Sequence, residues 1–194
     1  MKKTNKGFSL VELIIVIAIM AILAGAIAPA LIRYIDKSRR SNDVSAAKTI
    51  KTAIETTMAK ERAYEGLTIG ADQSTSDADS QTINYSTKIT VSGQGVETSG
   101  SGASIIQFSG DSFTGSTASA DKSNAQQEIA TNIGEKTPRV KYKKNAADGS
   151  SATSQEFTAY VSKGGSVVVG VTVTPSSGTA VFYQLAPTVS QYYQ

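Results

Sequence analysis

The first part of the chain is dominated by one apolar run. No charged residue occurs from Leu13 to Ile32, and the carboxylate of Glu12 lies directly before this run. As a helix, about 20 apolar residues at roughly 1.5 Å rise each span the hydrocarbon core of a bilayer. The pattern therefore predicts a membrane-length helix with an acid at its start. An ionisable residue in that place is a hypothesis for a functional site.

Beyond this run, apolar and small residues recur at three- and four-residue steps. This spacing predicts an amphipathic helix whose apolar stripe packs against the protein's own domain. No Gly or Pro occurs between Arg33 and Glu65, so we expect one helix from Phe8 to Glu65, ended by Gly66. The stripe consists of Val44, Ala47, Ile50, Ala53, Ile54 and Met58.

The segment 66–137 changes character, because Ser, Thr and Gly crowd it. Such a composition favours a long connecting region that is partly ordered. Alternation from Ile83 to Val91 predicts one strand, Ile105 to Phe108 predicts a short second strand, and Asn124 to Ile133 predicts a short helix.

The C-terminal part is rich in β-forming residues and turn signals. It predicts an antiparallel sheet, with a hairpin at Lys163–Ser166 and a turn at Ser176–Gly178. The expected fold class is α+β: a long N-terminal helix followed by this sheet. The expected strands are Arg139–Lys143, Phe157–Val161, Val167–Thr174 and Ala180–Leu185.

Three interpretations of the N-terminus compete. An ordinary signal peptide fits the basic start and the small residues near Pro29, but its apolar core is usually shorter and free of acids. A plain membrane anchor leaves Glu12 without a role. A cleaved leader ending at Gly7 makes Phe8 the new N-terminus and Glu12 the fifth residue of the mature chain.

The third interpretation matches a family. The segment Lys6-Gly7-Phe8-Ser9-Leu10-Val11-Glu12-Leu13 resembles the class III signal of type IV prepilins and pseudopilins. The resemblance covers roughly the first 35 residues. It implies that a prepilin peptidase cleaves after Gly7 and methylates the amino group of Phe8. It also implies that Glu12 recruits and registers each incoming subunit, and that the fold is that of type IV pilins, a helical spine carrying a sheet.

The resemblance also carries expectations about helix shape and partners. Pro29 lies where many members have a kinking proline, whereas many carry glycine at the position of Ala21 and this chain has Gly25 a turn later. Gly25 and Pro29 are therefore the expected kink positions. The implied partners are other copies in a helical homopolymer, the peptidase, the assembly platform with its ATPase machinery, and the membrane before assembly.

Elementary electrostatics supplies a mechanism for Glu12. Cleavage after Gly7 frees an amine with a reference pKa of about 7.7–8.0. That cation needs a partner when it is buried among apolar helices, and Glu12 is the only acid between Phe8 and Ile35. Removing one partner of such a pair costs about 3–5 kcal/mol. The pair would therefore select the register between helices, and it remains open whether it forms within one subunit or between neighbours.

Charge and cysteine content refine this interpretation. The formal net charge is +3, but Lys2, Lys3 and Lys6 belong to the leader, so the mature side chains balance and no nucleic-acid partner is expected. There is no cysteine, whereas many Gram-negative type IV pilins close their C-terminal region with a disulfide. A Gram-positive source is therefore expected.

The search for catalytic chemistry yields little. The chain has no histidine and no cysteine, which removes the commonest general base, the thiol nucleophile and most transition-metal sites. We expect no enzyme activity and no cofactor. Asp72, Asp77 and Asp79 are a weak calcium candidate, but their spacing is not that of an EF-hand and a solvated acidic loop is favoured.

The sequence thus predicts five segments: a leader (1–7), a transmembrane and filament-core helix (8–32), an amphipathic half (33–65), a connecting region (66–137) and a sheet (138–194). The expected function is that of a major pilin, first in the cytoplasmic membrane and then in an extracellular filament for adhesion or motility. A pseudopilin of a type II secretion or DNA-uptake system is the first alternative. A secreted adhesin or binding module with an ordinary signal peptide is the second.

Overall fold

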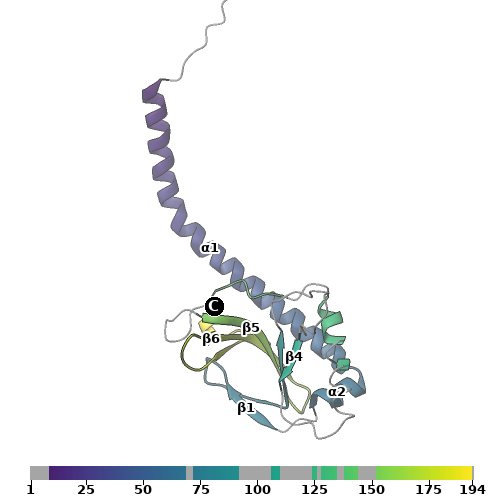
Figure 1. Ribbon diagram of the computed structural model, residues 1–194. Coiled ribbons are helices and arrows are strands. Elements are labelled where there is room, and N and C mark those ends of the chain that lie inside the picture. Colours follow the sequence, from purple (N-terminus) through teal and green to yellow (C-terminus); the bar gives the residue numbers. More distant parts are fainter. Residues whose placement is uncertain are drawn as a thin grey trace, which may run out of the picture. The chain divides into compact units, whose positions relative to one another are not determined.

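A computed structural model describes residues 9–68, 72–91, 106–109, 124–125, 128–134, 138–143 and 152–193 of the 194-residue chain. The chain divides into two compact units, Met1–Ser38 and Arg39–Gln194. Figure 1 shows the long first helix, α1, together with the strands and short helices of the second unit.

Helix α1 runs from Leu10 to Met58, followed by a second helix, α2, from Glu61 to Thr68. We expected a single helix to Glu65, and that expectation was wrong. The N–H groups of Ala59 and Lys60 bond to carbonyls three residues back, at 3.3 and 3.1 Å, which tightens the last turn of α1 and ends it. Gly66 is therefore a buried residue within α2 rather than a stop.

Seven strands are described, and all named pairings are antiparallel. Five form one sheet in the order β4-β3-β5-β6-β7, and β1 and β2 form a separate pair. The α+β fold expected from the sequence, a long N-terminal helix followed by an antiparallel sheet, is confirmed. The strands are β1 Gln73–Ser76, β2 Thr82–Tyr85, β3 Thr87–Val91, β4 Ile106–Ser109, β5 Ala152–Val161, β6 Val167–Pro175 and β7 Val181–Ala186, and a 3₁₀ turn, η1, spans Gln191–Tyr193.

One face of the five-stranded sheet packs on the second half of α1. Ala47, Ile50 and Ile54 of the predicted stripe are fully buried, in one cluster with alternate residues of the strands, such as Phe157 and Val171. Strand side chains alternate between the two faces of a sheet, so this cluster takes every second residue of β5 and β6. The predicted packing of the stripe against its own domain is confirmed.

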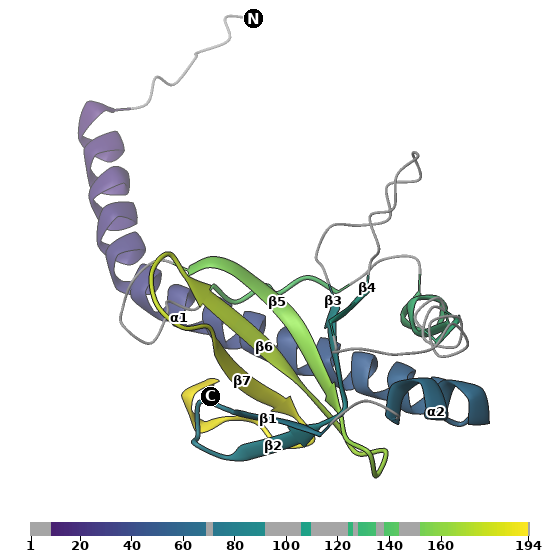
Figure 2. The same cartoon turned by 60° about the horizontal axis from the view of Figure 1, so that its bottom comes forward.

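The opposite face of the sheet is covered by the β1–β2 hairpin, which Figure 2 shows on the side away from α1. Here Ile83 of β2 joins Tyr160 of β5 and Phe182 of β7 in a second apolar cluster. The Tyr160 and Phe182 rings meet edge to face with centroids 4.9 Å apart, a favoured aromatic geometry. The second unit is therefore layered as helix, sheet and hairpin.

Two sequence predictions about the strands were wrong. The alternation from Ile83 to Val91 is not one strand, because it breaks at Ser86, whose hydroxyl lies 3.0 Å from the carbonyl oxygens of both Leu67 and Val161. The sheet is also not confined to residues 138–194, because β3 and β4 come from the segment expected to be a connection. The short helix was correct where it is described, at residues 124–125 and 128–133.

Candidate assembly site

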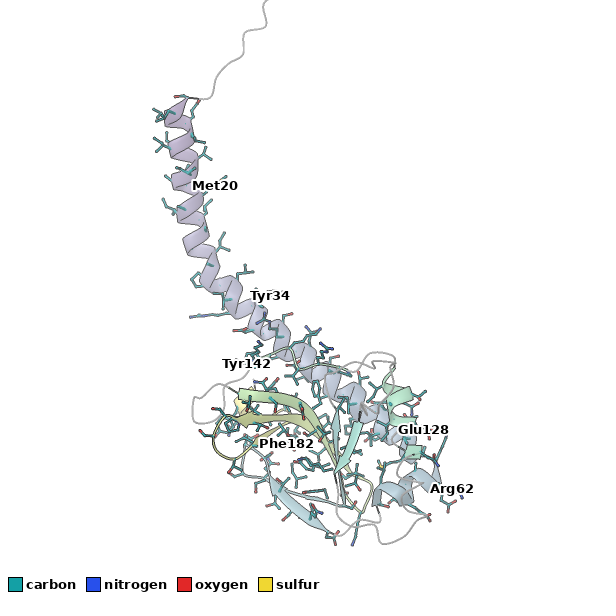
Figure 3. The ribbon with its side chains drawn as sticks, viewed as in Figure 1. Met20, Tyr34, Arg62, Glu128, Tyr142 and Phe182 are labelled. Atoms are coloured by element: carbon teal, nitrogen blue, oxygen red, sulfur yellow. The ribbon has the colours of Figure 1, made fainter. Side chains whose placement is uncertain are left out.

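The apolar half of α1, from Leu10 to Ile32, buries none of its side chains. Leu10 is 72% exposed and Ile22 is 73% exposed, and Figure 3 shows Met20 standing away from the helix. This helix is long and apolar enough to cross a membrane. A contiguous apolar surface of this size on a soluble monomer would be unusual, and such surfaces mark contacts with lipid or protein.

Glu12 lies in the first turn of α1, and one of its carboxylate oxygens accepts a hydrogen bond from the backbone N–H of Ser9 at 3.0 Å. Ser9 immediately precedes the helix, and its carbonyl accepts the N–H of Leu13. Ser9-x-x-Glu12 is thus half of a capping box, in which the acid satisfies a free donor at the helix start. The Glu12 carboxylate therefore faces the backbone one residue after Phe8.

The other predicted assembly residues are Gly7, Phe8, Gly25 and Pro29, and the structure describes two of them. Gly7 and Phe8 lie outside the described residues, so the cleavage and methylation site stays a prediction. Gly25 and Pro29 both lie within the continuous helix α1, and a Cβ added at Gly25 would meet no atom within 4 Å. Their role as kink positions also stays a prediction.

The carboxylates of two of the three aspartates in the calcium candidate are used in other contacts. The Asp72 carboxylate pairs with the Lys163 ammonium at 3.0 Å, whereas Asp77 is buried. Asp77 Oδ1 accepts the N–H groups of Asp79 and Gln81, at 3.0 and 2.8 Å, which organises the turn between β1 and β2. No metal-binding group of three His, Cys, Asp or Glu residues is found in the part of the chain that the structure describes.

Among the described residues of the second unit, Asp43 of α1 is the one acid whose side chain is fully buried. Its oxygens accept three hydrogen bonds, from the backbone N–H groups of Lys141 and Tyr142, at 2.8 and 2.9 Å, and from the Tyr193 hydroxyl at 2.8 Å. A buried carboxylate is tolerated when its oxygens are satisfied in this way. Asp43 therefore fastens residues 138–143 and the C-terminal turn η1 to the same helix.

This arrangement explains why the predicted strand Arg139–Lys143 is wrong. Residues 138–143 form no strand, because two of their backbone donors bond the Asp43 carboxylate. The Arg40 guanidinium reinforces the contact by donating to the Tyr142 hydroxyl at 2.8 Å and lying 4.4 Å from the centre of that ring. The attachment of this segment to α1 thus combines backbone, cationic and aromatic contacts.

Three buried tyrosines of the second unit stay protonated near neutral pH. Burial, reinforced by the Asp43 carboxylate, raises the pKa of the Tyr193 phenol above its ordinary value. Burial also raises the pKa of Tyr183 and, with the neighbouring Tyr85, raises that of Tyr160 to about 12. These tyrosines are packing and hydrogen-bonding groups rather than acids or bases near neutral pH.

The role of Asp43 was missed in the sequence, although a signal existed. Asp43 precedes Ala47 by four residues and Ile50 by seven, so it lies on the buried stripe of α1. A charged residue in phase with an apolar stripe is placed in the core and needs buried partners. The donors themselves, on residues 98 to 150 positions away, could not be identified from the sequence.

A polar depression of about 490 Å³ lies on α1 beside Asn132. Two of its four hydroxyls are used by the helix itself, since Thr49 donates to the Ser45 carbonyl and Thr56 donates to the Thr52 carbonyl. Lys48 is the one titratable side chain among the residues lining it. This lining offers no paired acid and base.

Known proteins resemble this chain in part of its length, and the matched family motif lies at the N-terminus. Residues 2–28 match the family described as "Prokaryotic N-terminal methylation motif". The chain is 46% identical over 56 residues to a type IV major fimbrial protein FimA of Dichelobacter nodosus, covering 29% of this chain and 36% of that protein. A "Fimbrial protein" of the same organism is 46% identical over 54 residues, which cover 28% and 34% of the two chains.

These similarities are partial. The chain spans about a third of the length of the curated relatives it matches, and no solved structure matches it. The relatives give no support to the expected Gram-positive source. The chain thus carries an N-terminal methylation motif and an apolar N-terminal helix compatible with a membrane span.

Proposed function

We propose that this chain is the major structural subunit of a type IV pilus, which polymerises through its apolar helix into a surface filament for adhesion or motility. The observation that carries the proposal is the combination of a methylation motif over residues 2–28 with an apolar first half of α1 whose side chains are all exposed in the described structure. The two fimbrial relatives support the same class of assembly.

In this proposal the subunit waits in the cytoplasmic membrane before assembly. A prepilin peptidase cleaves after Gly7 and methylates the amine of Phe8. The assembly platform and its ATPase then transfer the subunit to the base of the filament. There the apolar helices of neighbouring copies replace the bilayer, so the exposed surface from Leu10 to Ile32 becomes buried against the same surface of other subunits.

Glu12 sets the register of this bundle. Its carboxylate lies at the helix start, bonded to the N–H of Ser9, one residue from the amine that cleavage would create. A cationic amine buried without a partner is expensive, so an incoming helix is accepted at the stagger that pairs it with a carboxylate. The role is structural, and the proposal requires neither catalysis nor a cofactor.

The mass of the mature chain tests this proposal. Intact-mass and N-terminal peptide measurements should find a chain that begins at a methylated Phe8. A mature chain that begins at Pro29 or Leu31 instead would show an ordinary signal peptide and would refute the proposal. Gly7→Ala serves as the processing variant, and its mature mass should be replaced by that of the uncleaved chain.

Abundance separates the major pilin from a pseudopilin. Filaments sheared from the cell surface should contain this chain as the dominant band. Finding it only as a trace component would favour the pseudopilin of a type II secretion or DNA-uptake system, which shares the same helix and processing.

A further inference from the structure

The charges that follow the apolar run lie one bilayer thickness from Glu12. From Glu12 to Arg33 the helix advances by 21 residues, or about 31 Å at roughly 1.5 Å per residue. The hydrocarbon core of a bilayer is about 30 Å thick. A subunit with Glu12 at one boundary of the core therefore places Arg33 at the other, at the level of the lipid headgroups.

Three exposed side chains gather at that level, and we call them the collar: Arg33, Tyr34 and Lys37. Tyr34 is 73% exposed, and Figure 3 shows it standing away from the helix. Arg33 and Lys37 are four residues apart and so lie on one face of the helix. Asp36, the acid on the same turn, takes part in an interaction of its own.

We infer that the collar binds the phosphates of anionic phospholipids in the outer leaflet and so fixes the depth of the subunit before assembly. The inference rests on the membrane-stored state of the proposed function. Arg and Lys at the end of a membrane span extend to the headgroups, and tyrosine favours the same interface. Each such cation contributes attraction to an anionic surface.

Removal of the leader makes the collar the main ionic contact with the membrane. Before cleavage, Lys2, Lys3 and Lys6 flank the span on the other side. After cleavage, no cationic side chain precedes Arg33, and the acid Glu12 lies at the inner boundary. The mature subunit is then held to headgroups by side-chain cations at its outer end, and extraction into a filament must break this contact.

A second copy of the chain is a poorer partner for the collar. The apolar half of α1 offers a neighbour only one acid, Glu12, and Glu12 is needed by the Phe8 amine in the proposed register. Lipid phosphates, by contrast, are present around every waiting subunit at the level of the collar. The charge balance along the helix therefore favours lipid.

Native mass spectrometry of the mature full-length chain tests the inference. The protein is released from micelles that contain equal amounts of phosphatidylglycerol and phosphatidylcholine, and the lipids retained by each molecule are counted. The wild-type chain should retain phosphatidylglycerol preferentially. The double variant Arg33→Gln/Lys37→Gln should lose this preference by roughly 25-fold, since each cation contributes about fivefold.

Matched variants distinguish the collar from net charge. Lys48→Gln/Arg62→Gln removes two exposed cations of the second unit and should leave the preference unchanged. Arg33→Lys should retain most of it. Raising the salt concentration should weaken the wild-type preference, because ionic contacts are screened.

Two results would overturn the inference. One is an equal lipid preference in the wild type and the collar variant. The other is a collar variant that keeps its lipid preference but forms no filaments, which would make the collar a contact with a second copy. Neither result touches the proposed function, because cleavage and methylation at Phe8 are measured separately by mass.

Discussion

The two halves of α1 use the same secondary structure for opposite purposes. From Leu10 to Ile32 the helix exposes every large apolar side chain, whereas from Asp43 to Thr57 it buries one stripe completely. In the described part of the chain, the first half therefore buries none of its side chains. The second half forms one layer of an α+β unit. The five-stranded sheet packs on its apolar stripe, and the β1–β2 hairpin covers the opposite face of the sheet.

Under the proposed function, the apolar half of α1 serves assembly, whereas the second half of α1 and the sheet stabilise the fold. Substitutions in the apolar half should change association and leave the folded unit intact. Substitutions around Asp43 or in the sheet should change stability and leave processing of the N-terminus intact. A substitution in one region that changed the property assigned to the other would break that separation.

The largest effect is expected from Glu12→Ala. Loss of the carboxylate leaves the Phe8 amine without a partner in the helix bundle, at a cost of about 3–5 kcal/mol, so filaments should be absent or rare. Cleavage should proceed, and the thermal unfolding of the second unit in detergent should be unchanged. The yield of sheared filaments measures the effect.

Glu65→Ala is the matched control for this experiment, because Glu65 is an exposed acid on α2. It should give a normal filament yield. Normal filaments from Glu12→Ala as well would refute the pairing of Glu12 with the amine.

The next largest effect is expected from Asp43→Ala. The change leaves three donors without their acceptor, on Lys141, Tyr142 and Tyr193. An unsatisfied buried donor costs about 1–3 kcal/mol, so the second unit should lose about 3 kcal/mol or more. Denaturant unfolding of the mature chain in detergent measures this loss, and the N-terminal mass should stay that of the processed chain.

Tyr193→Phe tests the same contact by a smaller change. It removes one of the three donors and keeps the ring, so it should cost about 1 kcal/mol. An equal loss in Tyr193→Phe and Asp43→Ala would show that the carboxylate does not hold residues 138–143.

Gly170→Ala tests the packing between the neighbouring strands β6 and β7. A Cβ at position 170 would lie 2.1 Å from the Tyr183 carbonyl oxygen and 2.7 Å from the Phe182 ring, so backbone and ring must both shift. Overpacking of this kind typically costs about 1–3 kcal/mol. Gly164→Ala is the control, since its Cβ would meet nothing closer than 3.9 Å, and similar unfolding of the two variants would contradict this packing.

A smaller effect is expected from alkaline pH. The folded state raises the pKa of Tyr160 from 10.0 to about 12, so folding favours the protonated phenol. This contribution is complete below pH 10 and is lost as the pH rises toward 12. Tyr160→Phe should weaken the fall of the unfolding temperature over that range, and an unchanged pH profile would count against the burial of this phenol.

The apolar half could be predicted almost entirely from the sequence, because a helix whose side chains are all exposed in the described structure depends mainly on local pattern. The absence of charge from Leu13 to Ile32 gave its length, and Glu12 stood out because it had no role in a plain anchor. One local contact was missed. The Glu12 carboxylate accepts a hydrogen bond from the backbone N–H of Ser9, and the capping pattern Ser-x-x-Glu was present in the sequence.

The folded unit was predicted in outline and missed in its long-range contacts. The strands β5, β6 and β7 follow runs of β-forming residues and turn signals. Residues 139–143 resemble a strand locally but bond to Asp43 instead, about 100 positions earlier in the chain. The end of α1 at Met58 was likewise decided by bonds of its last turn rather than by a Gly or Pro.

The most direct test is the position of the Glu12 carboxylate in the assembled filament, measured by a high-resolution structure of the filament itself. Our account predicts a Glu12 oxygen within about 3.2 Å of the methylated Phe8 nitrogen of its own or a neighbouring subunit. A Glu12 carboxylate bonded only to the N–H of Ser9, with the Phe8 amine paired elsewhere, would contradict it.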